Sequence, residues 1–193
     1  MFELLVERGY QGTTMAEVAR QAGSSKETLY AWFGSKQGLF TALIRRQAAA
    51  ANQAMAAALD GAAHDPAATL TAFATNLLRL LLGERSVALN RAAVAEPAGE
   101  LATVLLAQGR HRTGPIVEAY LARLAAEGHL RIDDPGDAFQ LLYGLVVQDL
   151  QIRVLLGEPP PETATLAERA RVAVDRFLAL TAAGRPPEPG HLP

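Results

Sequence analysis

The sequence predicts an all-α fold, and three observations support that prediction. Alanine and leucine are abundant among the 193 residues, runs of β-branched residues are few, and no stretch of useful length alternates apolar and polar residues. Glycine, proline, serine and threonine instead divide the chain into segments of helical length. Half of the residues are hydrophobic and a fifth are charged, a balance typical of a globular protein.

Three short helices are expected in the first part of the chain. The first covers residues 1–8 and ends at a glycine. The second begins after Thr14, whose side chain can cap it, and ends at Gly23. Ser25 caps the third, which stops at Gly34. Three short helices are thus expected within about forty residues.

The rest of the chain is expected to form longer helices. One covers residues 36–60 and joins the amino-terminal helices to the remainder, and a break follows at residues 61–66. Later helices are expected at residues 67–82, 86–95, 98–127, 134–156 and 162–183. Gly109 and the pair Gly114–Pro115 can divide or kink the longest of them. Residues 184–193 contain four prolines and too little apolar surface to order themselves.

Charge is distributed unevenly along the chain. Residues 1–47 hold six basic and four acidic side chains, a net charge of +2, so the remainder of this chain of net charge −2 carries −4. A basic head on an acidic body suits a protein that offers one end to phosphates. The absence of cysteine excludes disulfides and thiolate chemistry, and no apolar run approaches the roughly 20 residues needed to cross a bilayer. We therefore expect a cytoplasmic protein with no membrane partner.

The spacing of the second and third helices is that of a helix-turn-helix. Gly23 lies where the chain reverses, and a glycine there tolerates a positive φ. Leu29 and Phe33, one turn apart, face inward, so the opposite face of the third helix is available to enter the major groove. The sequence therefore predicts a DNA-binding head.

These residues resemble the amino-terminal signature of tetracycline-repressor-like (TetR-type) regulators. The resemblance lies in Gly9-Tyr10-Gln11-Gly12-Thr13-Thr14, Val18-Ala19, Ala22-Gly23, Leu29-Tyr30, Phe33 and Lys36. It implies a three-helix DNA-binding domain, placed at residues 1–47, and a helical ligand-binding and dimerisation domain at residues 48–183. Carried over, the family's DNA contacts fall on Thr14, Ser25, Lys26, Thr28, Tyr30, Trp32 and Lys36.

The chain departs from the family pattern at several positions. Ser24 stands where valine is frequent, and Glu27 stands where glycine is common; Glu27 either reads a cytosine amino group or faces solvent. Trp32 replaces a histidine or another aromatic residue. Met1 falls inside the family's first helix, so either this sequence starts late or the first helix is shortened.

The last two helices carry wide apolar stripes, which either pair in a homodimer or fill the core of the subunit. In the resembled family these helices form the dimer, which places two recognition helices about 34–36 Å apart on a palindromic operator. The interface residues expected from this resemblance are Phe139, Tyr143, Val146, Val147, Leu150, Leu166, Val172 and Phe177.

A ligand cavity is expected among the helices between residues 67 and 156, where polar or aromatic groups interrupt apolar segments. The candidate lining residues, for which ordinary packing is an equal alternative, are Phe73, Asn76, Asn90, His111, Tyr120, Gln140 and Tyr143. Apolar walls favour a small hydrophobic or aromatic effector. The segment Leu130-Arg131-Ile132-Asp133-Asp134-Pro135 makes the carboxyl half resemble the AefR-like branch of the family.

Catalytic groups do not assemble in this sequence. The four histidines (His64, His111, His129 and His191) have no metal-ligand spacing, and the chain has neither a glycine-rich phosphate loop nor a serine elbow. We therefore expect no enzymatic activity, no cofactor and no metal. The hypothesis is a repressor that a small ligand releases from DNA by shifting the helix at residues 36–60. A helical small-molecule carrier or a sequence-independent DNA-binding protein remains the alternative.

Overall fold

The computed structural model describes residues 1–60 and 65–182, and in these ranges it is built from α-helices. The helices are α1 (Phe2–Gly12), α2 (Met15–Gln21), α3 (Lys26–Phe33), α4 (Lys36–Asp60), α5 (Pro66–Leu82), α6 (Glu84–Ala95), α7 (Glu100–Gln108), α8 (Arg110–Ala126), α9 (Pro135–Val147), α10 (Leu150–Leu155) and α11 (Thr163–Leu180). The all-α prediction is confirmed. Residues 61–64 of the break expected at residues 61–66, and the tail at residues 184–193, lie outside the described residues.

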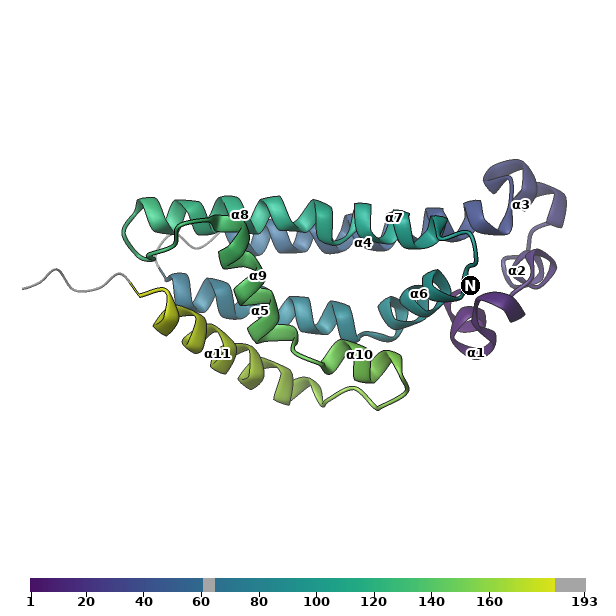
Figure 1. The fold of residues 1–193 in the computed structure, drawn as a ribbon. Helices are drawn as coiled ribbons and strands as arrows, with labels where there is room; N and C mark the ends of the chain where they lie inside the picture. Colours follow the sequence, from purple (N-terminus) through teal and green to yellow (C-terminus); the bar gives the residue numbers. More distant parts are fainter. Residues whose placement is uncertain (61–64, 183–193) are drawn as a thin grey trace, which may run out of the picture.

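The helices form a small head at one end of an elongated body (Figure 1). The head contains α1, α2, α3 and the first turns of α4. In the body, α4 runs lengthwise beside α7 and α8, α5 packs against α4 and α11, and α9 lies against α8 and α11. Helix α6 lies between the head and the body and contacts α1.

A large apolar core holds the body together. Phe73 and Leu78 of α5, Leu121 of α8, Leu142 of α9 and Phe177 of α11 have no exposed surface. Each aromatic or leucine side chain buried in this way stabilises the fold by about 1.5–3 kcal/mol relative to an exposed one. The apolar stripes of α9 and α11 are therefore filled by the chain itself.

A second apolar cluster joins the head to the body. Leu5 of α1 and Phe40 and Ile44 of α4 pack with Leu89 of α6 and Leu101 of α7, and all five are buried. The cluster crosses the expected domain boundary at residue 47, and α4 passes that boundary without a break. Head and body are thus in direct apolar contact in addition to their connection through α4.

The helix expected at residues 98–127 is divided in two. Gly109 ends α7 and precedes α8 with φ −93° and ψ −102°, a conformation outside the helical region. Pro115 lies inside α8, which continues through it to Ala126. Of the two expected breakpoints, Gly109 divides the segment and Gly114–Pro115 does not interrupt it.

The single helix expected at residues 134–156 was wrong. Asp134 caps α9 as expected, its side chain accepting a hydrogen bond from the Asp137 amide at 2.8 Å. The helix then ends at Val147, because Gln148 adopts φ 47° and ψ −131°. Helix α10 begins at Leu150 and packs against α6. Arg91 of α6 donates hydrogen bonds to the carbonyl oxygens of Val154 and Leu155 at the end of α10. This tertiary packing accounts for a break that no glycine or proline marks.

Candidate nucleic-acid interface and cavity

The head has the geometry of a helix-turn-helix. Gly23 takes φ 61° between α2 and α3, and the Ser24 amide donates to the Ala19 carbonyl oxygen at 2.9 Å, which closes the turn. Val18 and Leu29 are buried against each other's helices in a small core. The buried side of α3 fixes its orientation, so its opposite side forms an exposed convex surface.

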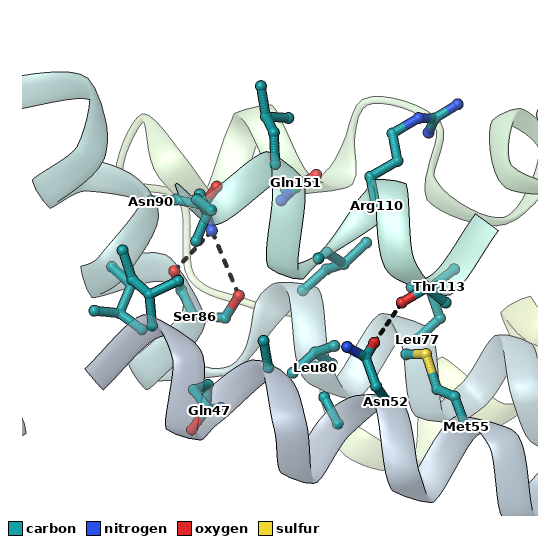
Figure 2. Close-up of a pocket in the computed structure, with 18 of the residues that line it drawn as sticks. Gln47, Asn52, Met55, Leu77, Leu80, Ser86, Asn90, Arg110, Thr113 and Gln151 are labelled. Atoms are coloured by element: carbon teal, nitrogen blue, oxygen red, sulfur yellow. Dashed lines mark hydrogen bonds between the residues drawn. The ribbon is translucent and has the colours of Figure 1, made fainter. Parts of the chain in front are cut away.

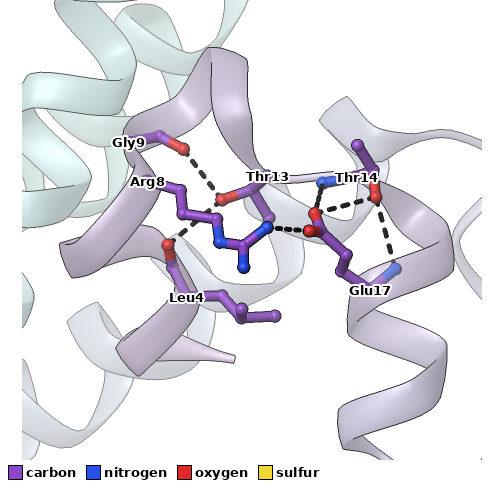
Figure 3. A network of polar contacts seen from close by, with 6 residues as sticks. All are labelled: Leu4, Arg8, Gly9, Thr13, Thr14 and Glu17. Atoms are coloured by element: carbon purple, nitrogen blue, oxygen red, sulfur yellow. Dashed lines mark hydrogen bonds and ion pairs between the residues drawn. The ribbon is translucent and has the colours of Figure 1, made fainter.

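The start of α2 is held by a capping box (Figure 3). The Thr14 hydroxyl donates to the Glu17 carboxylate at 2.9 Å and accepts from the Glu17 amide at 3.3 Å. Arg8 forms an ion pair with the same carboxylate. The hydrogen bond from the Thr14 side chain, with a smaller contribution from the Arg8 charge, lowers the pKa of Glu17. Glu17 was not among the expected site residues, although the spacing Thr-x-x-Glu is the sequence signature of this cap.

A buried threonine holds the bend between α1 and α2. The Thr13 hydroxyl donates to the Gly9 carbonyl oxygen at 2.8 Å and lies 3.4 Å from that of Leu4 (Figure 3). Gly9 itself, at φ 65°, interrupts the helical geometry of α1, which continues to Gly12. The expected end of the first helix at Gly9 is therefore a kink within α1.

The start of α3 is also capped locally. Ser25 Oγ accepts from the Thr28 amide at 3.0 Å and lies 3.0 Å from the Thr28 hydroxyl. Lys26 is exposed, and its Nζ lies 5.7 Å from the centre of the Tyr30 ring. These four residues bring two hydroxyls, a cation and a phenol together on the outer surface of the first two turns of α3.

The other expected contact residues differ in exposure. Tyr30 is 43% exposed and Trp32 is 69% exposed, which is unusual for large aromatic side chains. Lys36 is half-buried: its Nζ lies 4.3 Å from the centre of the Tyr10 ring and 3.4 Å from the Gln11 carbonyl oxygen. Burial lowers the pKa of Lys36. Tyr30 and Trp32 are thus free to meet a partner, whereas Lys36 is held in place.

The body contains a cavity of about 240 Å³ (Figure 2). Helices α4 to α10 all contribute to its wall. The apolar lining residues are Ile44, Ala48, Ala51, Met55, Phe73, Leu77, Leu80, Leu81, Leu89, Leu105, Leu106, Gly109 and Phe139. The polar ones are Gln47, Asn52, Ser86, Asn90, Arg110, Thr113, Tyr143 and Gln151. An apolar wall with a few polar groups is the usual form of a small-molecule site.

Most polar groups of the wall are paired with other protein groups. The Thr113 hydroxyl donates to Asn52 Oδ1 at 2.6 Å, and Asn52 Nδ2 donates to the Gln108 carbonyl oxygen at 2.9 Å. Asn90 Nδ2 donates to the Ser86 carbonyl oxygen at 2.9 Å (Figure 2). The first pair joins α4 to α8 across the cavity wall.

Arg110, at the start of α8, is an exposed residue whose side chain also borders the cavity. Its guanidinium carbon lies 4.6 Å from the centre of the Tyr143 ring and 5.5 Å from that of Phe139. Burial raises the pKa of Tyr143, and the Arg110 charge opposes that shift. The Tyr143 hydroxyl lies 3.4 Å from Gln151 Oε1, a long hydrogen bond.

Three of the seven expected ligand residues line the cavity: Phe73, Asn90 and Tyr143. The other four lie elsewhere. Asn76 borders a shallow depression between α5 and α11, His111 and Gln140 are exposed on the surface of α8 and α9, and Tyr120 is buried in the body core. The structure therefore places these four residues away from the cavity. The sequence could not show this, because adjacent residues of a helix point to different sides and no pattern marks the side that meets the cavity.

Most of the expected dimer residues do not lie on the surface of the chain. Six of the eight are buried within the single chain: Phe139, Val146, Val147, Leu150, Leu166 and Phe177. Tyr143 and Val172 are half-buried. A side chain enclosed by its own chain is not a surface that a partner can contact. Exposed apolar side chains occur instead at Leu141, Ile152, Leu156 and Leu180.

The described residues show neither a metal site nor a membrane span. No group of three or more His, Cys, Asp or Glu side chains gathers among them as a metal would require, and none of their helices is long and apolar enough to cross a bilayer. A helix-turn-helix head on an all-helical body is the architecture of a class of proteins, the DNA-binding regulators.

The sequence models of two families match this chain. The model of the AefR-like transcriptional repressor carboxyl-terminal domain matches residues 68–182, and the model of the bacterial tetR-family regulatory proteins matches residues 2–43. The chain therefore belongs to the TetR family of DNA-binding transcriptional regulators, as the sequence predicted.

Solved structures show the same fold. A TetR transcriptional regulator from Agrobacterium tumefaciens is 35% identical, with 95% of this chain and 91% of that chain covered and a TM-score of 0.74. A TetR-family regulator from Mesorhizobium loti is 24% identical, with 94% and 92% covered and a TM-score of 0.85. The flavonoid-responsive regulator FrrA is 25% identical, with 95% and 94% covered and a TM-score of 0.72. No curated protein sequence matches the chain.

Proposed function

We propose that this regulator represses transcription as a homodimer on a palindromic operator and leaves the operator when a small hydrophobic or aromatic compound fills the cavity. The observation that supports this most is the course of α4. The helix starts in the head, beside Lys36, and residues 47–55 in its middle supply Gln47, Ala48, Ala51, Asn52 and Met55 to the cavity wall. A ligand that displaces the middle of α4 therefore also displaces the head.

Helix α6 provides a second connection between the cavity and the head. Leu89 lines the cavity and also belongs to the cluster that packs Leu5 of α1 against the body. Movement of α6 on ligand binding changes the support of α1, against which α2 and α3 are folded. Both routes are physical contacts between the cavity and the head, which is what coupling between two sites requires.

In the proposed complex the outer face of α3 enters the major groove. Lys26, Thr28 and Tyr30 lie on that face, and Trp32 offers an indole N–H toward a phosphate. Thr14, Ser25 and Lys36 lie at helix starts, where free amides favour anions. We propose these seven residues as the DNA contacts, with Thr14 and Lys36 acting through the local structures that hold them.

The homodimer is proposed to form through the outer faces of α9 and α11. Leu141 and Leu145 lie one turn apart on α9, the first exposed and the second half-buried, and Val172 is half-buried on α11. Replacing Leu141 with arginine places a charge on this apolar face, so we expect the dimer to dissociate. Sedimentation velocity measures this, and a monomer–dimer equilibrium equal to that of the wild type would exclude this face.

The test of DNA recognition is selection of bound fragments from a pool of random duplexes. We expect enrichment of one palindromic sequence, with two half-sites about 10 base pairs apart or a multiple of that distance. In fluorescence anisotropy with the selected duplex, Lys26→Ala and Tyr30→Ala should weaken binding, whereas Arg112→Ala on the exposed surface of α8 should not. Salt-sensitive binding without any enriched sequence would instead support the sequence-independent alternative.

Release is tested with the same duplex and a panel of alkyl and aryl compounds in charged and neutral forms. A compound that binds the cavity should lower the affinity of the dimer for the operator. Retained affinity in the presence of saturating compound would refute the coupling through α4, and tight compound binding without any DNA binding would support the carrier alternative.

A further inference from the structure

We propose that the effector is a small amphipathic anion, whose apolar part fills the cavity and whose single anionic group binds Arg110. This inference rests on the effector role proposed for the cavity and specifies the chemistry of the compound. It follows from the charge of the wall, the position of the arginine, the pairing of the other polar groups and the size of the space.

The charge of the wall is entirely of one sign. Among the residues that line the cavity, Arg110 is the one charged side chain, and no aspartate or glutamate accompanies it. Within the described residues Arg110 also forms no salt bridge, unlike Arg8, Arg153 and Arg171. A cation at the edge of an apolar space without a counter-ion creates a positive potential there, which favours an anionic ligand over a neutral one.

The arginine is also held in place for such a contact. Its guanidinium lies over the rings of Tyr143 and Phe139, both of which line the cavity. The aromatic rings take up the face of the guanidinium, and a hydrogen bond to the Tyr143 hydroxyl uses part of its edge, which leaves its other N–H donors for a ligand. Those donors form a fork that matches the two oxygens of a carboxylate. The first turn of α8, which starts at Arg110 with no side-chain cap, adds its dipole to the same potential.

Other polar groups of the wall are already paired, which favours Arg110 as the group that binds the anionic end of the ligand. Asn52 is bonded to Thr113, and Asn90 is bonded to Ser86, so their side chains already have partners on the protein. Much of the remaining wall is apolar and includes Leu77, Leu80 and Met55 (Figure 2). One charged group beside a largely apolar wall matches the polarity of an amphipathic ligand.

The size of the cavity restricts the ligand further. At about 240 Å³ it lies below the range of about 300–1,000 Å³ that is usual for drug-sized ligands. A medium-chain alkyl group or a fused pair of aromatic rings is of suitable size, whereas a large polar ligand is not. The effector class is therefore a medium-chain aliphatic or an aromatic monoanion.

The experiment compares matched probes that differ in charge alone. Octanoate and octanamide form an aliphatic pair, and naphthylacetate and naphthylacetamide form an aromatic pair. Binding to the full-length wild-type protein is measured by isothermal titration calorimetry. Because charge-assisted hydrogen bonds are worth more than neutral ones, we expect at least one carboxylate to bind about tenfold or more tightly than its amide.

Variants of two neighbouring arginines assign the effect. Arg110→Met should abolish the preference for the carboxylate and leave amide binding within about twofold, and Arg110→Lys should keep part of the preference. Arg112→Met is the matched control, because Arg112 is exposed on the same helix and does not line the cavity. Unchanged binding of the selected duplex by each variant shows that the fold is intact.

The outcomes separate this inference from the proposed function. If amides bind as well as carboxylates and release the operator, the effector role of the cavity stands and the anion inference is wrong. If Arg112→Met weakens carboxylate binding as much as Arg110→Met, the effect is one of general surface charge and the inference is also wrong. If neither member of either pair binds, the inference and the effector role of the cavity both fail.

Discussion

The helix caps of the head and one bond of the cavity wall differ in how far apart in the sequence their partners lie. In the head, Thr14 bonds to Glu17 and Ser25 to Thr28, each three residues away. In the cavity wall, Asn52 bonds to Thr113, which is 61 residues away. The caps of α2 and α3 are therefore complete once each helix forms, whereas the bond between Asn52 and Thr113 exists only when α4 and α8 pack.

The largest expected effect is at the residue that joins the two regions. Phe40 is fully buried in the cluster shared by α1, α4, α6 and α7. Phe40→Ala should lower the free energy of unfolding by about 3–5 kcal/mol, because a cavity forms where head and body meet. Urea denaturation measures this loss. The control is Val94→Ala on the exposed surface of α6, which should change stability by no more than about 0.5 kcal/mol.

Breaking the long-range contact in the cavity is expected to cost less. Thr113→Val leaves Asn52 Oδ1 without its 2.6 Å donor, so the free energy of unfolding should fall by about 1–3 kcal/mol. Adding Asn52→Leu removes the stranded acceptor, so the double variant should lose less than the sum of the single losses. A strictly additive double-mutant cycle by urea denaturation would mean that the two side chains do not interact.

Breaking the local contact in the head should have a smaller, confined effect. Thr14→Ala removes the side-chain half of the capping box, which should lower stability by about 0.5–2 kcal/mol and weaken operator binding. The matched control, Thr165→Ala on the exposed surface of α11, should leave both unchanged. Equal losses in stability for the two variants would show that the cap does not stabilise α2.

The same cap should give the head a dependence on pH. Because the Thr14 hydrogen bond lowers the pKa of Glu17 in the folded protein, the ionised carboxylate stabilises the fold above the ordinary glutamate pKa. That contribution should be lost as the pH falls through the lowered folded value. An NMR titration of the Glu17 side chain should show its pKa rising toward the ordinary value in Thr14→Ala. An identical Glu17 pKa in both proteins would contradict the assigned cause.

The smallest expected effect is a gain. Gln148 holds φ 47° and ψ −131° between α9 and α10, a conformation that glycine adopts without strain. Gln148→Gly should therefore raise the free energy of unfolding by up to about 1 kcal/mol. Gln140→Gly, inside α9 and exposed, should instead lower it by about 1 kcal/mol. If Gln148→Gly instead lowers stability in thermal or urea denaturation, the inference that the Gln148 backbone is strained is wrong.

The same contrast explains what the sequence could predict. The caps of α2, α3 and α9 use residues three positions apart, so Thr14, Ser25 and Asp134 were identified correctly. The extent of α4 was also predicted correctly, because its limits lie beside a serine start and a glycine break. Local chemistry is visible in a single sequence.

Features set by distant partners were not visible. The break at Gln148 follows two valines and resembles the continuing helix around it; it arises from the packing of α10 against α6. Arg110 and Asn52 give no sequence signal, because their role depends on helices packed from other parts of the chain. The apolar stripe predicted for α9 is present in the structure. Tertiary packing decides whether such a stripe faces a partner or α5 and α8 of the same chain.

The unbroken course of α4 also sets the scale of movement that this protein needs. At 1.5 Å per residue its 25 residues span about 37 Å. A tilt of about 5° at one end of a rod of that length moves the other end by about 3 Å, close to the 3.4 Å rise between base pairs on one strand. In the proposed mechanism, a small tilt of α4 is therefore enough to shift the head by a distance comparable to the spacing of base pairs.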